Sequence, residues 1–383
     1  MSRSYDVIVA GLGAMGSAAA FHLARRGQRV IGLDRYAPPH DRGSSSGRSR
    51  IIREAYFEHP AYVPLVQRAY ELWRELEYGS GRTLMTPTGG LMIGPPEGEL
   101  VAGALASARA HELHHEVLDA AALAQRYPGM TPTAETVAVW EPRAGVLFPE
   151  ACIEEHLRAA ANAGAELRGE QPATRWTASD AGVEVVTPHE TLTAGALILA
   201  AGAWMGELLP DAGLALEVRR QPLFWFEPLG EPERFSPQRF PVFIWEHDPG
   251  RFIYGFPDFG DGVKLARHGE GERTAPGSVR RDVTSVEAEE VRGTAERLLP
   301  GAIGPPRSAA TCLYTNTPDH HFVLDAHPAH PNVWIASPCS GHGFKFSSAI
   351  GEILADWVTG REPRFDLGLF RLARFQSHAR DIK

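Results

Sequence analysis

Gly11-Leu12-Gly13-Ala14-Met15-Gly16 follows directly on an apolar run from Asp6 to Ala10, which suits a short buried strand. Residues 14–26 suit a helix, and a second apolar run from Arg29 ends at Asp34. Glycines permit a tight turn and the close approach of a pyrophosphate, whose charge the helix N-terminus stabilises. Asp34 can accept hydrogen bonds from ribose hydroxyls. This order of strand, glycine turn, helix, strand and acid predicts a Rossmann-like dinucleotide site.

Length and charge narrow the class of protein. A chain of 383 residues exceeds what one core usually supports, which predicts two domains. A net charge of −9 argues against nucleic acid or an anionic membrane as the main partner. Residues 7–24 carry no charge, but glycines interrupt them and Arg25 and Arg26 follow rather than precede them. We therefore expect neither a membrane span nor a signal sequence, and a cytoplasmic protein.

Lysine is almost missing from this chain. Of 38 basic residues only Lys264, Lys345 and the terminal Lys383 are lysine. Arginine can replace lysine wherever a surface charge is wanted, but not where a compact, deprotonatable ammonium is needed. Lys264 and Lys345 stand in apolar, glycine-rich segments, so we interpret both as site residues. Chance survival of two lysines is the alternative.

The remaining pattern predicts an α/β protein in which a sheet-rich domain interrupts the nucleotide domain. Helical spacing is found at 59–77, 98–112, 150–164, 284–299 and 343–357, and strands dominate 215–268. The predicted FAD-binding domain comprises 1–80, 148–212 and 310–383. The predicted substrate domain comprises 81–147 and 213–309.

The glycine turn alone is compatible with NAD, NADP, FAD or S-adenosylmethionine. Three later segments favour FAD. Leu199 to Trp204, which contains Gly202, is a strand leading into a glycine turn. The loop from Gly43 to Gly47, with Ser45 at its centre, offers backbone donors. A strand at 332–337 leads into Gly341, Gly343 and a further helix, a second helix N-terminus for the cofactor.

Several motifs then occur in a specific order: Arg50-Ile51-Ile52-Arg53, Tyr254-Gly255-Phe256-Pro257, Lys264, Thr311-Cys312-Leu313-Tyr314-Thr315, Pro318-Asp319 and Ser340-Gly341-His342-Gly343-Phe344-Lys345-Phe346. Over nearly its whole length the chain resembles the monomeric sarcosine oxidase and N-methyl-tryptophan oxidase family, relatives of glycine oxidase and D-amino-acid oxidase. The resemblance implies FAD joined covalently through Cys312. Cys152 and Cys339 are better explained as small buried residues.

The resemblance also assigns roles to the charged residues. Arg53 and Lys345 match the pair that binds the substrate carboxylate, although an ion pair of Arg53 with Glu54 or Glu58 is an alternative. Lys264 matches a lysine over the flavin face that promotes reaction with oxygen by stabilising superoxide; a strand-edge surface lysine is the alternative. Arg50 is expected beside the flavin.

Tyr254, His268 and Tyr314 match residues on the substrate side, and Trp245 is expected to shape the same pocket. Arg35, Phe344 and Lys345 complete the expected cofactor contacts. His320, His321 and His327 lack the spacing of a metal site, so no metal is expected. One departure is that relatives commonly carry His-Gly-Asp where this chain has Ser46-Gly47-Arg48.

The expected function is that of an FAD-dependent sarcosine oxidase, which turns an N-methyl amino acid into glycine, formaldehyde and hydrogen peroxide by transfer of a hydride equivalent to the flavin. Its partners would be the amino acid and oxygen, and it would act as a monomer. Oxidation of bulkier or cyclic secondary amino acids, such as N-methyl-tryptophan, pipecolate or proline, is the alternative. A flavin-binding redox sensor without turnover is a remote one, because a sensor needs neither the carboxylate pair nor Lys264.

Overall fold

The computed structural model describes residues 5–210, 212–337 and 340–375. Its first sheet is built on β1 (Tyr5–Ala10), which pairs in parallel with β2 (Val30–Leu33) on one side and β12 (Thr191–Leu199) on the other. β9 (Glu166–Arg168) extends the sheet beyond β2, and β20 (His330–Ser337) extends it beyond β12. β10 (Arg175–Ser179), β11 (Gly182–Val186) and β19 (Val323–His327) join by antiparallel pairing. The predicted strand, helix and strand at the N-terminus are present.

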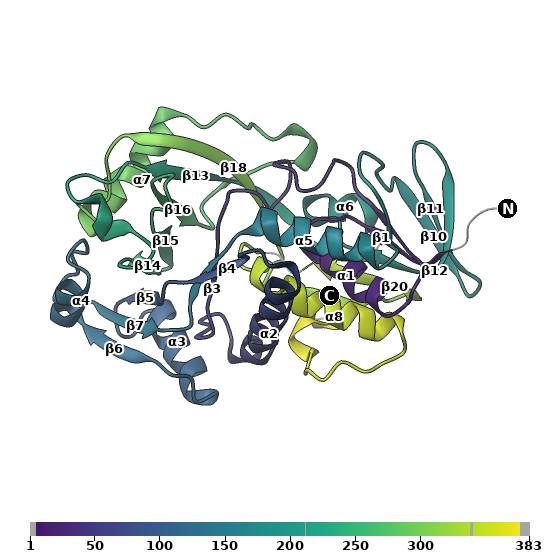
Figure 1. Ribbon diagram of the computed structural model, residues 1–383, viewed down its shortest axis with the longest axis horizontal. Coiled ribbons are helices and arrows are strands. Elements are labelled where there is room, and N and C mark those ends of the chain that lie inside the picture. The colour runs from purple at the N-terminus through teal and green to yellow at the C-terminus, as the bar shows by residue number, and fades with distance from the viewer. Residues whose placement is uncertain (1–4, 211, 338–339, 376–383) are drawn as a thin grey trace, which may run out of the picture.

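Helices pack beside this sheet (Figure 1). α1 (Ala14–Arg25) contacts both α5 (Pro149–Asn162) and α8 (Ser347–Val358), and α2 (Val63–Ser80) packs on α8. The α1–α8 approach is close, because a Cβ at Gly351 would lie 2.5 Å from the backbone of Ala18. The core therefore joins segments from the beginning, the middle and the end of the chain.

A second sheet lies at the other side of the molecule in Figure 1. Its order is β17 (Glu272–Arg273), β13 (Glu217–Phe226), β16 (Val263–His268), β15 (Arg251–Phe256), β14 (Val242–Asp248), β5 (Gly90–Gly94), β7 (Val137–Glu141) and β6 (Glu116–Asp119). α3 (Glu99–Ala110), α4 (Ala120–Arg126) and α7 (Ser285–Leu298) accompany it. Thr284 and Glu287 form a capping box at the start of α7, which fixes where that helix begins.

β18 (Pro306–Asn316) connects the two halves. It pairs with β13 throughout its length, and its arrow in Figure 1 runs from beside α7 towards the first sheet. The boundary predicted at residue 310 lies inside β18, so 310–316 belong to the second sheet. The rest of the predicted domain division remains a proposal, supported by how the strands are shared between the two sheets.

Some elements were not expected. A small sheet of β3 (Arg50–Ile52), β8 (Gly145–Leu147) and β4 (Met85–Pro87) lies between the two larger sheets in Figure 1. The short helix α4 was not predicted either. α6 (Met205–Leu208) is a single turn. In the described residues, none of the helices combines the length and apolar composition needed to cross a bilayer. The predicted α/β fold with a Rossmann-like sheet is confirmed.

Candidate active site

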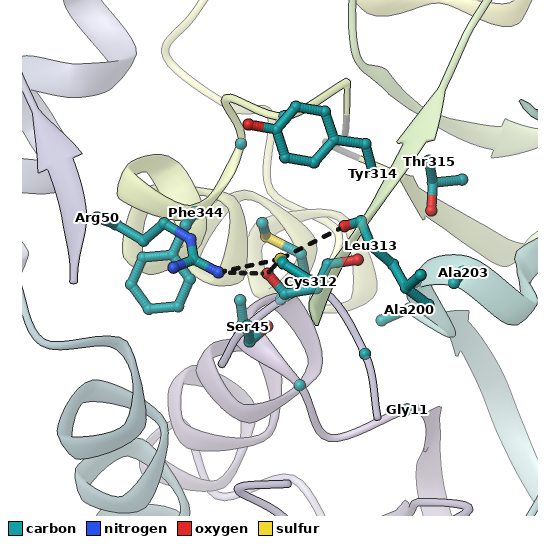
Figure 2. Close-up of a pocket in the computed structure, with 18 of the residues that line it drawn as sticks. Gly11, Ser45, Arg50, Ala200, Ala203, Cys312, Leu313, Tyr314, Thr315 and Phe344 are labelled. Atoms are coloured by element: carbon teal, nitrogen blue, oxygen red, sulfur yellow. Dashed lines mark hydrogen bonds between the residues drawn. The ribbon is translucent and has the colours of Figure 1, made fainter. Parts of the chain in front are cut away.

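One cavity collects most of the predicted site residues. Its lining is drawn from both large sheets, from the loop before β3 and from the turn before α8. Figure 2 shows Gly11, Ser45, Arg50, Cys312 and Phe344 around it. Of the predicted residues, those that line the cavity are Gly11, Gly13, Ala14, Met15, Asp34, Arg35, Ser45, Arg50, Arg53, Gly202, Tyr254, His268, Cys312, Tyr314, Gly341, Gly343, Phe344 and Lys345.

The glycines of the first turn serve different purposes. Gly11 has φ +100°, and a Cβ there would lie 2.4 Å from the Ala200 carbonyl oxygen. A Cβ at Gly16 would lie 1.7 Å from the Gly11 carbonyl oxygen, so this glycine lets the helix pack on its own turn rather than lining the cavity. At Gly13 a Cβ would meet only Ser45 Oγ, at 3.8 Å. No contact with the described residues therefore requires glycine at position 13. A ligand lying against this backbone would require it.

The N-terminus of α1 fits an anionic ligand. Gly13 caps the helix without a side-chain hydrogen bond, and its first turn contains no acidic residue. Its first N–H groups therefore lack the usual side-chain acceptor, and the helix dipole adds partial positive charge at this point. The cavity side of this turn suits the pyrophosphate of a dinucleotide.

Asp34 and Arg35 continue this end of the cavity. The Asp34 carboxylate accepts hydrogen bonds from the backbone N–H of Leu12 at 2.7 Å and of Tyr36 at 2.9 Å. The predicted ribose acceptor thus also fastens the glycine turn to the end of β2, a role that the sequence did not reveal. Arg35 forms an ion pair with Glu207 at 2.6 Å and lies over the Trp204 ring.

Cys312 and Arg50 meet on the cavity wall (Figure 2). Arg50 Nη2 donates to Cys312 Sγ at 3.4 Å and to the carbonyl oxygens of Ser44 at 2.8 Å and Ser46 at 2.6 Å. Cys312 is buried, and its thiol is free. Arg50 therefore directs a hydrogen-bond donor at the Cys312 sulfur on the cavity wall.

The other cysteines differ from Cys312. Cys152 is a buried residue of α5 whose thiol faces the Leu84 carbonyl oxygen, and burial raises its pKa well above the ordinary value. It lies outside the cavity lining, as expected for a small buried residue. Cys339 lies outside the described residues.

Lys264 is buried behind the cavity wall rather than on it. Its Nζ donates to the Gly47 carbonyl oxygen at 2.7 Å, the Ser49 carbonyl oxygen at 3.0 Å and Ser49 Oγ at 3.0 Å. Three acceptors suit an ammonium, because a neutral amine has only two hydrogens to donate. Burial and the nearby Arg50 oppose this by lowering the Lys264 pKa. The alternative of a strand-edge surface lysine is wrong, since Lys264 is only 2% exposed.

Arg53 and Lys345 lie on the same side of the cavity, and both are buried. Arg53 Nη2 donates to both Glu58 oxygens, at 2.8 and 2.6 Å, which realises the ion-pair alternative in a buried setting. Lys345 Nζ donates to the His342 carbonyl oxygen at 2.7 Å and to the Tyr56 hydroxyl at 3.4 Å. Burial and the Arg53 charge lower the Lys345 pKa to about 7.

The charge of this group matches a single carboxylate. Arg53 and Glu58 cancel each other, and attraction to Arg53 helps to lower the Glu58 pKa to about 2 despite burial. The group therefore has one net positive charge while Lys345 is protonated and none when it is not. Glu58 and Tyr56 were not expected here, because neither carries a motif of its own; the structure identifies them by contact alone.

Tyr254, His268 and Tyr314 form the adjoining wall. Tyr254 and His268 come from the neighbouring strands β15 and β16, and His268 Nδ1 lies 3.3 Å from the Tyr314 hydroxyl. Burial lowers the His268 pKa to about 4 and raises the Tyr254 pKa to about 12. The Tyr314 ring requires glycine at position 341, which has φ +81°, because a Cβ there would lie 2.2 Å from the ring. This wall is uncharged at neutral pH.

Trp245 is placed elsewhere, and its expected contribution to the pocket is corrected. It packs among the buried side chains of the second sheet with Ile93, Phe243 and Ile253, and it is missing from the described residues that line the cavity. Ile244, its neighbour in β14, lines the cavity instead. Successive side chains of a strand point to opposite faces of the sheet, so the predicted residue was one position away from the one that faces the cavity.

The three histidines set aside as metal ligands have other partners. His320 offers its carbonyl oxygen to His342 Nε2, His321 Nδ1 contacts the Tyr62 hydroxyl at 3.1 Å, and His327 packs edge-on against Trp176. Within the part of the chain that the structure describes, no group of three or more His, Cys, Asp or Glu side chains is arranged to hold a metal ion.

This geometry can be compared with known proteins. The sequence pattern of the family described as "DAO: FAD dependent oxidoreductase" matches residues 6–357. The chain belongs to this family. The open turn at Gly13 and the uncapped α1 fit its cofactor, so FAD-dependent oxidoreductase activity on CH–NH groups, expected from the sequence, is confirmed.

Individual relatives match almost end to end. Monomeric sarcosine oxidase of Streptomyces avermitilis is 45% identical over 374 residues, 97% of each chain. Monomeric sarcosine oxidase of Bacillus sp. strain NS-129 is 38% identical over 380 residues, 98% of each chain. N-methyl-L-tryptophan oxidase of Salmonella heidelberg is 36% identical over 374 residues, 97% of this chain and 99% of that one. The family resemblance seen in the motifs is confirmed.

Solved structures of low identity share the fold of this DAO-family chain. NikD, an unusual amino acid oxidase essential for nikkomycin biosynthesis, has a TM-score of 0.81 and 24% identity, with 97% of this chain and 98% of that chain covered. Glycine oxidase from Geobacillus kaustophilus has a TM-score of 0.80 and 22% identity, with 97% and 99% covered.

Proposed function

We propose that this chain is an FAD-dependent oxidase of N-methyl amino acids and that sarcosine is its preferred substrate. The observation that carries the proposal is the pair of buried cations, Arg53 and Lys345, on the cavity that also contains the glycine turn and Cys312. The names of the relatives, two of them monomeric sarcosine oxidases, support the substrate class. The overall reaction is sarcosine, water and oxygen giving glycine, formaldehyde and hydrogen peroxide.

The carboxylate would bind at the cationic end. Its charge neutralises the single net positive charge of Arg53, Glu58 and Lys345, and it accepts charge-assisted hydrogen bonds from the two cations. This binding orients the N-methyl group relative to Tyr254, His268 and Tyr314. Lys345 must be protonated for the neutralisation to be complete.

The uncharged wall would select the neutral amine. His268 is neutral at neutral pH, and Tyr254 and Tyr314 keep their protons. A buried, uncharged surrounding disfavours an ammonium and so lowers the pKa of the bound amine. The FAD, when bound, supplies the acceptor for the two electrons of the C–N oxidation. The chain's contribution is to present a deprotonated amine to it.

Turnover of a substrate panel tests the proposed reaction. We expect hydrogen peroxide and formaldehyde from sarcosine with the highest kcat/KM of a panel that includes N-methyl-tryptophan, pipecolate and proline. Peroxide and formaldehyde are measured separately, because only an N-methyl substrate yields both. A higher kcat/KM for a bulky or cyclic amino acid would favour the alternative substrate class, and no peroxide from any would favour a redox sensor.

We also propose that FAD is attached covalently to Cys312. The proposal is supported by a free thiol that lines the cavity and accepts a hydrogen bond from the Arg50 guanidinium. Arg48 is the departure from the relatives' pattern. Its guanidinium pairs with Asp261 at 3.0 Å and is half exposed.

Removal of the thiol tests this attachment. Protein precipitated with acid is expected to stay yellow in the wild type, whereas Cys312→Ala releases its flavin into the supernatant. Cys152→Ala is the matched control, because it removes a buried thiol outside the cavity. Yellow precipitate from the Cys312→Ala variant would contradict the assignment.

Oligomeric state and location complete the proposal. We propose that the enzyme acts as a monomer in the cytoplasm, in line with the word "monomeric" in the names of its relatives. Its partners are then a small amino acid and oxygen.

A further inference from the structure

A chain of hydrogen bonds links the Lys345 ammonium to the His342 ring through the Tyr56 hydroxyl. Lys345 Nζ contacts the Tyr56 hydroxyl at 3.4 Å, and this hydroxyl lies 2.5 Å from His342 Nδ1. His342 Nε2 lies 3.0 Å from the His320 carbonyl oxygen. Tyr56 is fully buried, and Lys345 and His342 are nearly so. The proposed function gives neither Tyr56 nor His342 a part.

The far end of this chain fixes the direction of every hydrogen bond in it. A carbonyl oxygen only accepts, so His342 Nε2 must carry the hydrogen that points at His320. In a neutral imidazole the other nitrogen, Nδ1, is then an acceptor, and the Tyr56 hydroxyl must donate to it. With its hydrogen used, the Tyr56 oxygen turns lone pairs towards Lys345, whose ammonium donates.

The imidazole is neutral because it is buried. Burial lowers the His342 pKa to about 3, although the Glu58 carboxylate, 3.9 Å from Nδ1, favours the charged form. The ring is stacked on Phe322 and tilted against Tyr56, which leaves it little freedom to turn. Burial and the Lys345 charge lower the pKa of this ring, and together they outweigh the Glu58 carboxylate and the hydrogen bond to His320, which raise it.

We propose that Tyr56 and His342 are positioning residues that hold Lys345 protonated and aimed at the carboxylate of the substrate. The inference rests on the carboxylate-binding role in the proposed function. His342 contributes twice, since its carbonyl oxygen accepts from Lys345 at 2.7 Å while its ring orients the Tyr56 hydroxyl. Two acceptors thereby hold two ammonium hydrogens, and the third is left for the cavity that Lys345 lines.

The Tyr56 ring has a second effect on the same site. The centre of this ring lies 4.2 Å from the Arg53 guanidinium and 5.1 Å from Lys345 Nζ, so one ring attracts both cations. Tyr56→Phe keeps this ring and removes only the hydroxyl. The substitution therefore separates the effect of the hydrogen-bond chain Lys345–Tyr56–His342 (the relay) from the effect of ring packing.

The test measures the affinity of the holoenzyme for acetate as a function of pH, using the absorbance of the bound flavin. Wild-type affinity should fall as pH rises through the Lys345 pKa. In Tyr56→Phe we expect about tenfold weaker binding, as for the loss of one hydrogen bond to a charged group. The pH midpoint should also move downward, because the ammonium has lost an acceptor. For the substrate, KM should rise with little change in kcat.

Three variants separate the relay from general damage. Tyr62→Phe is the matched control, since its hydroxyl serves His321 and its ring lies 4.7 Å from Tyr56. It should leave affinity and midpoint unchanged. His342→Asn places an amide oxygen near the position of Nδ1 and should retain the wild-type midpoint. His342→Phe keeps the stacking on Phe322 but removes Nδ1, which leaves the Tyr56 hydroxyl only the more distant carbonyl oxygen of residue 342, at 3.2 Å, as acceptor. Its midpoint should shift in the same direction as that of Tyr56→Phe.

Each outcome either supports or overturns the proposed role of the relay. Equal midpoints in the wild type, Tyr56→Phe and Tyr62→Phe would overturn it, and so would equal shifts in His342→Asn and His342→Phe. Absence of acetate binding to the wild type would overturn it together with the carboxylate site. A shifted midpoint in Tyr56→Phe, in an enzyme that oxidises no N-methyl amino acid, would support the relay while the proposed substrate class fails.

Discussion

Lys264→Met is expected to slow the reaction of the reduced enzyme with oxygen by about 10²–10³-fold, the cost of losing one preorganised electrostatic contact to a developing anion. The ammonium is held by three acceptors from the loop that precedes β3, so its position is fixed before oxygen arrives. Methionine keeps the volume and the apolar stem but removes the charge. The stabilisation that this ammonium gives to the negative charge developing on oxygen would then be lost.

Stopped-flow absorbance separates the two half-reactions. Anaerobic reduction by sarcosine should change little in Lys264→Met, while reoxidation by oxygen carries the loss. Arg267→Met is the matched control, because it removes a positive charge from the same strand but from a side chain that pairs with Glu290 outside the cavity. Equal slowing of reoxidation by both variants would show that Lys264 acts only through net charge.

The rate of reoxidation should depend on pH in a definite direction. Burial and Arg50 lower the Lys264 pKa, and the protonated form is the one that stabilises an anion. The wild-type reoxidation rate should therefore fall as pH rises through that pKa, and the rate of Lys264→Met should stay low and flat over the same range. A pH-independent wild-type rate would contradict an ionising Lys264.

What the sequence predicted well is what depends on neighbouring residues. The turn from Gly11 to Gly16 was predictable because its constraints are local: a positive φ at Gly11 and close packing within one helical turn at Gly16. The burial of Lys264 and Lys345 followed from composition, since a chain that otherwise uses arginine has kept lysine at two apolar positions. These inferences needed no knowledge of how distant segments meet.

What the sequence missed depends on such meetings. Tyr56 and His342 are 286 residues apart, and their contact arises only when the turn before α8 packs beside the segment after β3. Trp245 was misplaced because the facing of β14 is set by its register with β15, in which Ile244 lies opposite Tyr254. One step in register reverses every side chain of a strand, and composition does not fix that step.

The last expected result concerns Lys345→Met, which should impair the other half-reaction. Without Lys345, Arg53 and Glu58 leave no net charge for the substrate carboxylate, so binding should weaken by about 10–100-fold, as for a lost hydrogen bond to a charged group. Anaerobic reduction at low sarcosine concentration should slow in proportion, and reoxidation by oxygen should not.

Two further variants fix the cause as charge rather than packing. Lys345→Arg replaces a compact ammonium by a larger planar group, so its acetate affinity should be weaker than wild type near pH 6. Because arginine stays charged, this affinity should not fall as pH passes about 7, where wild-type Lys345 loses its proton. Glu58→Gln removes the opposing charge and should tighten acetate binding near pH 6. It also removes a carboxylate that raises the Lys345 pKa, so its affinity should begin to fall at lower pH than in the wild type. Weaker binding in Glu58→Gln near pH 6, or a wild-type affinity that is constant between pH 6 and 9, would contradict the charge balance. Because acetate affinity reports the carboxylate site alone, the role of Lys345 is tested even if the substrate is not sarcosine.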